Sequence, residues 1–342
     1  MDIQDSLLLK AANNKEVERT PVWLMRQAGR ILPEYRKVRA SVSGFKELVK
    51  TPELACEVTL QPVDILNVDA AIIFSDILVI PEAMGLNYEM VENTGPIFPK
   101  TICSAKDIEK LNLANEENLE YVTNAIKLTR SELKSTLPLI GFAGAPWTIF
   151  SYMLEGKGSK TFSKARSFLY CEPEASHILL DKITQSTITY LKAQIKAGAN
   201  IIQIFDSWSG ILGPEIYEVF GIEYIKRICD AINEVPIIVF AKGANNSIEK
   251  LSKLNCNVIG LDWQVKIQDA RKWAGPKALQ GNLDPTVLYA DQKTIQEHTK
   301  SMLNAFGKVG HIANLGHGVY PDTPLDGVKC FIDTIKEHRI SD

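Results

Sequence analysis

The stretch Ala70-Ala71-Ile72-Ile73-Phe74-Ser75-Asp76 shows the pattern from which the fold is predicted. Its apolar residues run on without alternation, which is typical of a strand buried on both faces of a parallel sheet. A carboxylate follows at the point where such a strand would end. Seven further runs of this kind occur, at 22–25, 139–142, 201–205, 237–240, 258–261, 278–280 and 311–314.

Segments with helical periodicity lie between these runs, at 116–133, 175–197, 214–232 and 247–254. Strands that alternate with helices indicate parallel βαβ units, and eight strands predict an α/β protein with a single (β/α)8 TIM barrel as one domain over residues 1–342. An open, doubly wound sheet is the alternative. Its dinucleotide-binding form is disfavoured, because no G-x-G-x-x-G follows the first run. Residues 86–98, with Asn93-Thr94-Gly95-Pro96 at the centre, predict an inserted β-hairpin.

Composition and charge exclude several classes of function. The chain has 41 acidic and 38 basic residues, a net charge of −3, and no basic tract that would favour nucleic acid. No apolar run is long enough for a membrane helix, and the first 20 residues lack the apolar core of a signal peptide. We therefore expect a cytoplasmic protein with neither a nucleic-acid nor a membrane partner. The six cysteines form no C-x-x-C pattern.

Polar residues follow most of the predicted strands. In a (β/α)8 barrel the carboxyl ends of the strands form one mouth, where the chemistry takes place. The segments that would gather there are Arg26-Gln27-Ala28-Gly29-Arg30, Ser75-Asp76, Gly144 to Trp147, Asp206-Ser207-Trp208, Lys242-Gly243, Asp262-Trp263, Gly281 to Pro285 and Leu315-Gly316-His317-Gly318.

The arginines are concentrated near the start of the chain, where five of the ten fall between residues 19 and 39. A solvated helical face is the simpler explanation. Arg26 and Arg30 argue against it, because they directly follow an apolar run and flank Gly29, which would let a ligand approach the backbone. The planar guanidinium suits carboxylates and phosphates, so we predict an anionic substrate.

Asp76 and His317 are the other candidate site residues. A carboxylate at the end of a buried strand needs a cation, backbone donors or the N–H groups of a ligand, and an ion pair with Arg26 or Arg30 is the structural alternative. His317 lies between two glycines, which would favour close approach of a ligand; a loop histidine bonded to the backbone is the alternative. No second histidine or cysteine follows at ligand spacing, so we expect no metal.

Four motifs together resemble the uroporphyrinogen decarboxylase family. They are Pro21-Val22-Trp23-Leu24-Met25-Arg26-Gln27-Ala28-Gly29-Arg30, Phe74-Ser75-Asp76-Ile77-Leu78, Gly141-Phe142-Ala143-Gly144-Ala145-Pro146-Trp147-Thr148 and Asn314-Leu315-Gly316-His317-Gly318-Val319. They occur in family order along almost the whole chain.

This resemblance implies a (β/α)8 barrel that works as a homodimer without cofactor or metal. The enzyme would remove the four acetate carboxylates of uroporphyrinogen III as CO2, giving coproporphyrinogen III for haem biosynthesis. By the same resemblance Asp76, Arg26 and Arg30 would be catalytic. The substrate-binding residues would be Arg26, Gln27, Ala28, Gly29, Arg30, Phe45, Asp76, Tyr152, Ser207 and His317.

Two other functions compete with this interpretation. Metal-dependent methyltransferases related to the same barrel carry H-x-C and a later cysteine as zinc ligands, whereas this chain has Phe240-Ala241-Lys242-Gly243 and His317 at those strand ends. A tetrapyrrole carrier without turnover would share the pocket. The residues leave open the proton donor, the order in which the acetates are lost and the dimer contacts; Arg26 would need a water or a substrate carboxylate as a proton relay, because guanidinium is a very weak acid.

Overall fold

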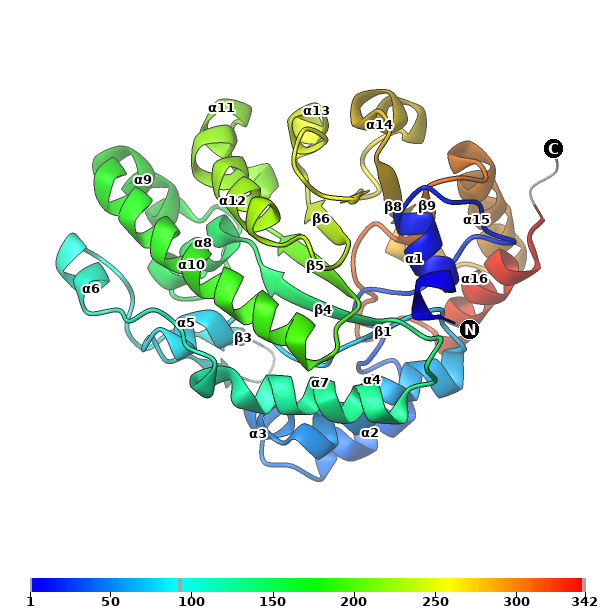
Figure 1. Ribbon diagram of the computed structural model, residues 1–342, viewed down its shortest axis with the longest axis horizontal. Helices are drawn as coiled ribbons and strands as arrows, with labels where there is room; N and C mark the ends of the chain where they lie inside the picture. The colour runs from blue at the N-terminus through cyan, green and yellow to red at the C-terminus, as the bar shows by residue number, and fades with distance from the viewer. Residues whose placement is uncertain (1, 92–93, 340–342) are drawn as a thin grey trace.

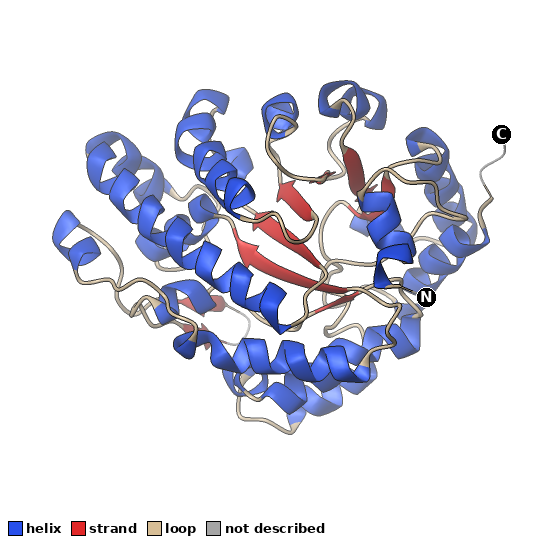
Figure 2. Cartoon of the chain, viewed as in Figure 1, coloured by secondary structure: helices blue, strands red, loops and turns tan. Residues whose placement is uncertain are grey.

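The computed structural model describes residues 2–91 and 94–339, and its parallel strands lie inside a layer of helices (Figures 1 and 2). Sheet neighbours follow the order of the chain. The strands are β1 (Ala71–Ile72), β4 (Leu139–Gly144), β5 (Ile201–Asp206), β6 (Ile237–Ala241), β7 (Val258–Gly260), β8 (Ala278–Leu283) and β9 (His311–Leu315). Most of their residues are buried, as the unbroken apolar runs predict.

The segment 21–23 fills the gap between the last strand and the first. Val22 forms a parallel bridge with Ala313 of β9, whose amide donates to the Pro21 carbonyl at 2.9 Å. On the other side the amide of Asp69, just before β1, donates to the Val22 carbonyl at 2.8 Å. This eighth position completes the ring, so the predicted (β/α)8 barrel is confirmed over the open sheet.

The prediction of a regular strand over 22–25 is wrong beyond its first residues. The Leu24 amide donates to the side-chain oxygen of Gln27 at 3.0 Å, and the Met25 amide donates to Asn314 Oδ1 at 3.2 Å. Arg26 then adopts a left-handed backbone with φ of 63°. Side-chain amides thus replace the sheet hydrogen bonds here, because the chain turns sharply into the barrel mouth.

Helices form the outer layer of the barrel (Figure 2). They are α1 (Leu7–Ala12), α2 (Pro33–Ala40), α3 (Phe45–Lys50), α4 (Pro52–Leu66), α5 (Val79–Ala83), α6 (Ala105–Glu109), α7 (Glu120–Glu132), α8 (Pro146–Glu155), α9 (Ser163–Cys171), α10 (Pro173–Ala197), α11 (Pro214–Tyr217), α12 (Glu223–Ala231), α13 (Ile248–Leu251), α14 (Ile267–Ala274), α15 (Gln292–Phe306) and α16 (Leu325–Glu337). Asn14, just after α1, donates to the Pro276 carbonyl, so the end of α1 lies at the amino ends of the strands.

The helix predicted over 214–232 is interrupted. A π-helical turn, Glu218–Ile222, separates α11 from α12. The Tyr217 ring lies so close to Gly221 that a Cβ there would be 2.3 Å from the ring. The helix predicted over 247–254 is also shorter, since α13 ends at Leu251. The helices predicted over 116–133 and 175–197 are confirmed as α7 and α10.

The predicted hairpin is present as β2 (Glu89–Val91) paired antiparallel with β3 (Gly95–Ile97). Its predicted turn begins at Asn93, and residues 92–93 lie outside the described part of the chain. The hairpin follows α5, which itself follows β1 and Asp76, so this insertion lies next to a candidate site residue. Across residues 2–91 and 94–339, no helix is long and apolar enough to cross a membrane.

Candidate active site

Arg26 is held in the barrel mouth by the loop that follows β9. A Cβ on Gly318 would lie 2.5 Å from Arg26 Cδ and 2.6 Å from Cγ, so the stem of the arginine occupies the space that glycine leaves. The Val319 amide donates to the Met25 carbonyl at 3.1 Å. These contacts join the first and last segments of the barrel at the point where the guanidinium projects.

The Arg26 guanidinium is solvent-accessible and yet closely surrounded by protein. Desolvation lowers its pKa, and the nearby Tyr152 and Tyr320 oppose that shift. Within the described residues the guanidinium has no hydrogen bond and no ion pair. An unpaired cation in this setting is available for an anionic ligand.

Lys242 supplies a second unpaired cation at the end of β6. Its amide donates to the Asp206 carbonyl at 3.0 Å, and its carbonyl accepts from the Gly210 amide and the Ser209 hydroxyl at 2.9 and 2.8 Å. The ammonium lies 6.0 Å from the centre of the Trp263 ring and has no carboxylate partner in the described part of the chain. Sequence reasoning placed Lys242 at a strand end but did not select it as a site residue.

His317 lies beside both cations. Burial, followed by the charges of Arg26 and Lys242, lowers the pKa of His317 to about 3, so the imidazole is neutral at neutral pH. Its flanking glycines also make room for the protein's own chain. A Cβ on Gly316 would lie 2.4 Å from the Trp263 amide nitrogen, and Gly318 makes room for Arg26. Both glycines therefore accommodate the protein's own chain.

Asp76 is held by two donors from its own side of the barrel. Oδ1 accepts from the Leu78 amide at 3.2 Å, and Oδ2 accepts from the Tyr88 hydroxyl at 2.8 Å. Burial raises the pKa of the Asp76 carboxyl, and these hydrogen bonds oppose that shift. The alternative ion pair with Arg26 or Arg30 is absent from the described residues. No feature of the sequence links Tyr88 to Asp76.

Tyr152, on α8, lies near both the carboxylate and the cation. Burial raises the pKa of Tyr152, and its phenol is close enough to feel both the charge of Asp76 and the opposite charge of Arg26. Its ring packs edge-on against Phe162 at 5.8 Å and Trp208 at 6.3 Å. Tyr152 therefore lies near both the carboxylate and the guanidinium of the site.

Ser207 and Phe45 lie at the ends of two other elements. Ser207 directly follows β5 and is half-buried, and its hydroxyl has no hydrogen bond within the described residues. Phe45 begins α3, and its ring centre lies 5.7 Å from that of Phe74, just after β1. Both therefore lie at the carboxyl end of the barrel, and for Ser207 this position follows from the predicted strand before it.

The remaining predicted site residues differ in their surroundings. The Gln27 side chain is fully buried, with its oxygen bonded to the Leu24 amide and its nitrogen bonded to the Ala70 carbonyl at 3.0 Å. Its backbone amide is also used, because it donates to the Leu24 carbonyl at 3.1 Å, so Gln27 supports the turn that carries Arg26. Arg30 is exposed, and its carbonyl accepts from Arg36 at 2.6 Å. The half-buried residues between them are Ala28 and Gly29.

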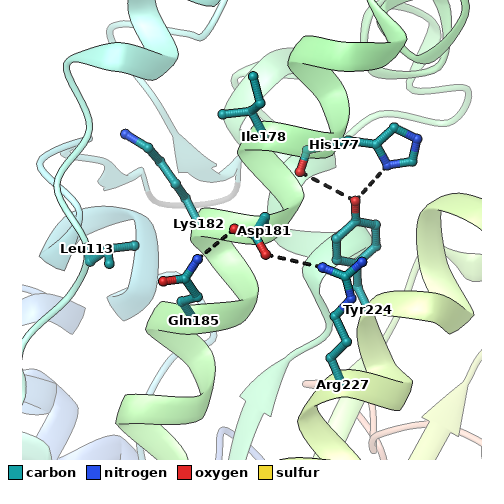
Figure 3. Close-up of a pocket in the computed structure, with 8 residues that line it drawn as sticks. All are labelled: Leu113, His177, Ile178, Asp181, Lys182, Gln185, Tyr224 and Arg227. Carbon is teal, nitrogen blue, oxygen red and sulfur yellow. Dashed lines mark hydrogen bonds and ion pairs between the residues drawn. The ribbon is translucent and has the colours of Figure 1, made fainter.

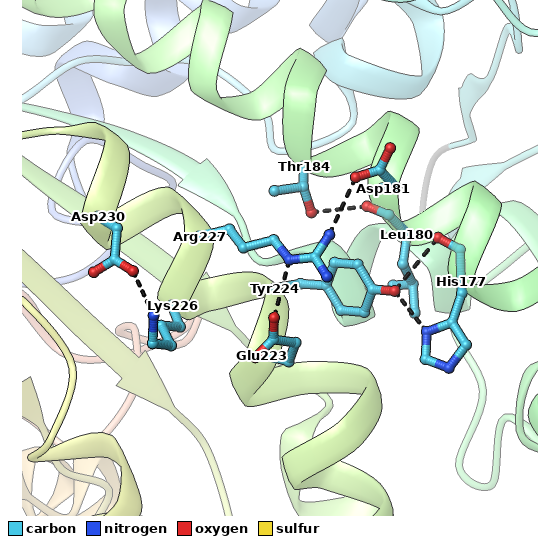
Figure 4. A network of polar contacts seen from close by, with 9 residues as sticks. All are labelled: His177, Leu180, Asp181, Thr184, Glu223, Tyr224, Lys226, Arg227 and Asp230. Carbon is cyan, nitrogen blue, oxygen red and sulfur yellow. Dashed lines mark hydrogen bonds and ion pairs between the residues drawn. The ribbon is translucent and has the colours of Figure 1, made fainter.

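A groove of about 510 Å³ lies outside the barrel, between α10 and α12 (Figure 3). Its polar side chains bond one another: the Tyr224 hydroxyl is 2.7 Å from His177 Nδ1, and Arg227 pairs with Asp181 at 3.2 Å (Figure 4). None of the predicted site residues lines it. The groove is therefore separate from the site in the barrel mouth.

The closed barrel and its cationic mouth define a (β/α)8-barrel enzyme that acts on an anionic substrate. A family model described as uroporphyrinogen decarboxylase matches residues 4–338, and the chain belongs to this family. The protein is accordingly a decarboxylase of porphyrin and haem biosynthesis, as the sequence motifs predict.

Curated relatives match over nearly the full length of both chains. The uroporphyrinogen decarboxylase of Schizosaccharomyces pombe is 49% identical over 353 residues, covering 98% of each chain. That of Chloroherpeton thalassium is 48% identical over 345 residues, again with 98% coverage of each. The enzyme of Hamiltonella defensa is 47% identical and covers 99% of this chain and 97% of its own.

Solved structures confirm the fold. A methyltransferase from Methanosarcina mazei superposes with a TM-score of 0.83 at 20% identity, covering 98% of this chain and 99% of its own. A B12-independent methionine synthase from Shewanella sp. W3-18-1 gives a TM-score of 0.57 at 12% identity, with 86% and 90% coverage. At these identities the likeness shows the shared barrel alone.

Proposed function

We propose that Asp76 accepts the pyrrole N–H groups of uroporphyrinogen and stabilises the positive charge that develops during decarboxylation. The observation that carries this proposal is the state of the carboxylate, which is desolvated and oriented by Leu78 and Tyr88. A carboxylate has about four acceptor positions, so about two remain for the substrate. A fixed negative charge in a desolvated site stabilises a developing cation more strongly than water does.

The chemistry requires such a charge. A proton adds to the pyrrole carbon next to the one that bears the acetate, which makes the ring a cation that can accept electrons at the acetate-bearing carbon. The bond between the acetate CH2 and its carboxylate then breaks, CO2 leaves, and the electron pair neutralises the ring as an exocyclic double bond forms. A second proton adds to that methylene to give a methyl group, while the ring carbon loses the first proton. Four such cycles turn the four acetates into methyl groups.

The cations would bind the carboxylates that are not reacting. Arg26, Arg30 and Lys242 lie at or near the barrel mouth, and none has a carboxylate partner within the described residues. A substrate with eight carboxylates needs several such contacts for orientation, which lowers the barrier by holding the reacting group in place. Arg26 orients a carboxylic acid or a water that relays the proton, because guanidinium is a very weak acid.

Neutral groups would complete the site. The uncharged imidazole of His317 and the hydroxyls of Tyr152 and Ser207 provide hydrogen bonds without adding charge. Phe45 would line the pocket and help to exclude water, which strengthens the electrostatic contacts. The half-buried Ala28 and Gly29 would contribute backbone groups, while the buried Gln27 would hold the turn that carries them.

The chain is further proposed to act as a single domain, in the cytoplasm and as a homodimer, in keeping with its family. Each chain has a mass of 38.0 kDa. Sedimentation velocity should therefore give a species of twice that mass at micromolar concentration. A species of one chain's mass under the assay conditions would contradict the homodimer.

Anaerobic incubation with uroporphyrinogen III, followed by chromatography, tests the proposed reaction. The products should have seven, six, five and finally four carboxylates. Binding of the substrate without any loss of carboxylates would instead support the carrier. Turnover that is abolished by a chelator and restored by zinc would favour the metal-dependent alternative.

A further inference from the structure

Tyr88 lies at the start of the inserted hairpin, and its side chain reaches into the barrel mouth. It directly precedes β2, and its side chain is almost fully buried, at 3% exposure. Its hydroxyl donates to Asp76 Oδ2 at 2.8 Å. Tyr88 is the only side chain that donates a hydrogen bond to this carboxylate in residues 2–91 and 94–339.

Three contacts fix the position of Tyr88. The Lys46 ammonium lies 4.0 Å from the centre of the tyrosine ring and donates to the Tyr88 carbonyl. Lys46 is itself fixed by Glu82, at 2.6 Å. The Tyr88 ring also packs against Phe98 at 5.7 Å, on the other side of the hairpin. The hydroxyl is thus presented to Asp76 by a side chain with little freedom to move.

The other groups near Asp76 do not replace this donor. Tyr121, Tyr152 and Tyr190 are close enough to interact with its charge, but none is hydrogen-bonded to it. Lys46 acts on Asp76 through its charge, and its hydrogen bonds go to Glu82 and Tyr88. The Leu78 amide bonds the other oxygen, Oδ1. The Ile77 amide also favours the charged form, but Tyr88 remains the only side-chain donor to Oδ2 among the described residues.

We propose that Tyr88 is a positioning residue for the decarboxylation, whose hydroxyl keeps the Asp76 carboxylate ionised and fixes the direction of its free lone pairs. This inference rests on the proposed role of Asp76. The phenol does not touch the reacting atoms. It favours the charged form of the carboxylate in a place where burial favours the neutral form.

The pH dependence of kcat/KM for Tyr88→Phe tests this inference, because that profile reports the ionisation of groups in the free enzyme. Loss of a donor to the charged form raises the pKa of the carboxyl, so the acid limb should move to higher pH. We expect a shift of about one pH unit, which corresponds to a hydrogen bond to a charged group. At alkaline pH the rate should recover most of the way to wild type.

Tyr121→Phe is the matched control, since it removes the same atom from a tyrosine near Asp76 that does not bond it. The acid limb of the Tyr121→Phe profile should coincide with that of the wild type. A Tyr88→Phe profile that overlays the wild type, or that is lowered equally at every pH, would overturn the inference. Wild-type turnover in Asp76→Asn would overturn the role of Asp76 itself, so the two failures are distinguishable.

Discussion

The position of Arg26 depends on Gly318, which is distant in the sequence. The backbone of Gly318 does not have a positive φ, so alanine fits the chain, but its Cβ would lie 2.5 Å from Arg26 Cδ. We expect Gly318→Ala to displace the guanidinium and lower kcat/KM at least about tenfold, since a misplacement of about 1 Å can cost about 10²-fold. Gly158→Ala, with open space around its Cβ, is the control. Unchanged kinetics in Gly318→Ala would contradict the packing argument.

Lys242 should act through its charge. Lys242→Gln keeps most of the length of the side chain and removes the ammonium that would bind a substrate carboxylate. We expect KM to rise about tenfold or more, as for the loss of a hydrogen bond between charged groups, with a smaller change in kcat. The exposed Lys272, on α14, provides Lys272→Gln as a control. Equal KM values for the two variants in steady-state assays would remove Lys242 from the site.

The sequence identifies the site residues whose positions follow from the barrel itself. Arg26, Asp76 and His317 follow predicted strands, and parallel strands bring their carboxyl ends to one face. Tyr88 could not be found in this way. It reaches Asp76 across a hairpin, and the contact depends on how that insertion packs against the barrel.

The end of β5 is tied to two helices through Asp206. This carboxylate is fully buried and accepts from the Thr148 hydroxyl of α8 at 2.6 Å and from the Tyr217 hydroxyl of α11 at 2.9 Å. The Trp208 amide also donates to the Thr148 hydroxyl, so the same cluster holds the segment that carries Ser207. Asp206 therefore supports the site without facing it.

The stability of this cluster should depend on pH. Burial raises the pKa of Asp206 from 3.8 to about 6. A carboxyl with a raised pKa stabilises the fold fully below pH 4, and this stability is lost as the pH rises to about 6. The loss is on the order of 3 kcal/mol. Asp206→Asn cannot ionise, so its unfolding free energy relative to wild type should increase from pH 4.5 to pH 8.

Urea unfolding across that pH range is the measurement, with the exposed Glu34→Gln as the control. If the difference in unfolding free energy between Asp206→Asn and wild type does not change with pH, the fold does not raise the pKa of Asp206. A larger difference at low pH would give the opposite sign and contradict the account.

The elements themselves were predicted well where local pattern and burial agree. Buried apolar runs gave the central strands, and long amphipathic segments gave α7 and α10. The first run failed as a strand because Gln27 and Asn314 replace its backbone partners. The break between α11 and α12 follows from the contact of Tyr217 with Gly221, which depends on the π-helical turn and could not be read from periodicity.

Closure of the whole barrel depends on a charged pair beside the first segment. Asp69 accepts two hydrogen bonds from Arg19, at 2.8 and 2.6 Å, and a third from the Val22 amide at 2.8 Å. Both side chains of the pair are largely buried, at 18% and 12% exposure. The same carboxylate thus binds the segment that completes the ring.

Asp69→Ala should destabilise the protein by about 3 kcal/mol, because it leaves a partly buried guanidinium and an amide without their acceptor. Chemical denaturation measures this loss. Glu116→Ala removes an exposed pair with Lys196 and should change stability by less than about 1 kcal/mol. If the two variants unfold at the same denaturant concentration, Asp69 does not hold the ring closed.

The whole-molecule architecture could be predicted from the number and character of the strands, and the motifs indicated the family. The closure of the ring could not be predicted, because it combines a single bridge at Val22 with side-chain hydrogen bonds. The same holds for the electrostatics of the mouth. The raised pKa of Asp76 and the neutral state of His317 depend on burial that only the assembled barrel provides.

Turnover and thermal unfolding of Asp76→Asn, measured on one preparation, decide whether Asp76 stabilises the substrate cation. The substitution keeps the shape of the side chain and removes the charge that would stabilise the substrate cation. Since burial disfavours the ionised carboxyl in the fold, the variant should unfold at or above the wild-type temperature. Its turnover should fall by at least about two orders of magnitude. A variant that loses stability but keeps near-normal turnover would contradict the account.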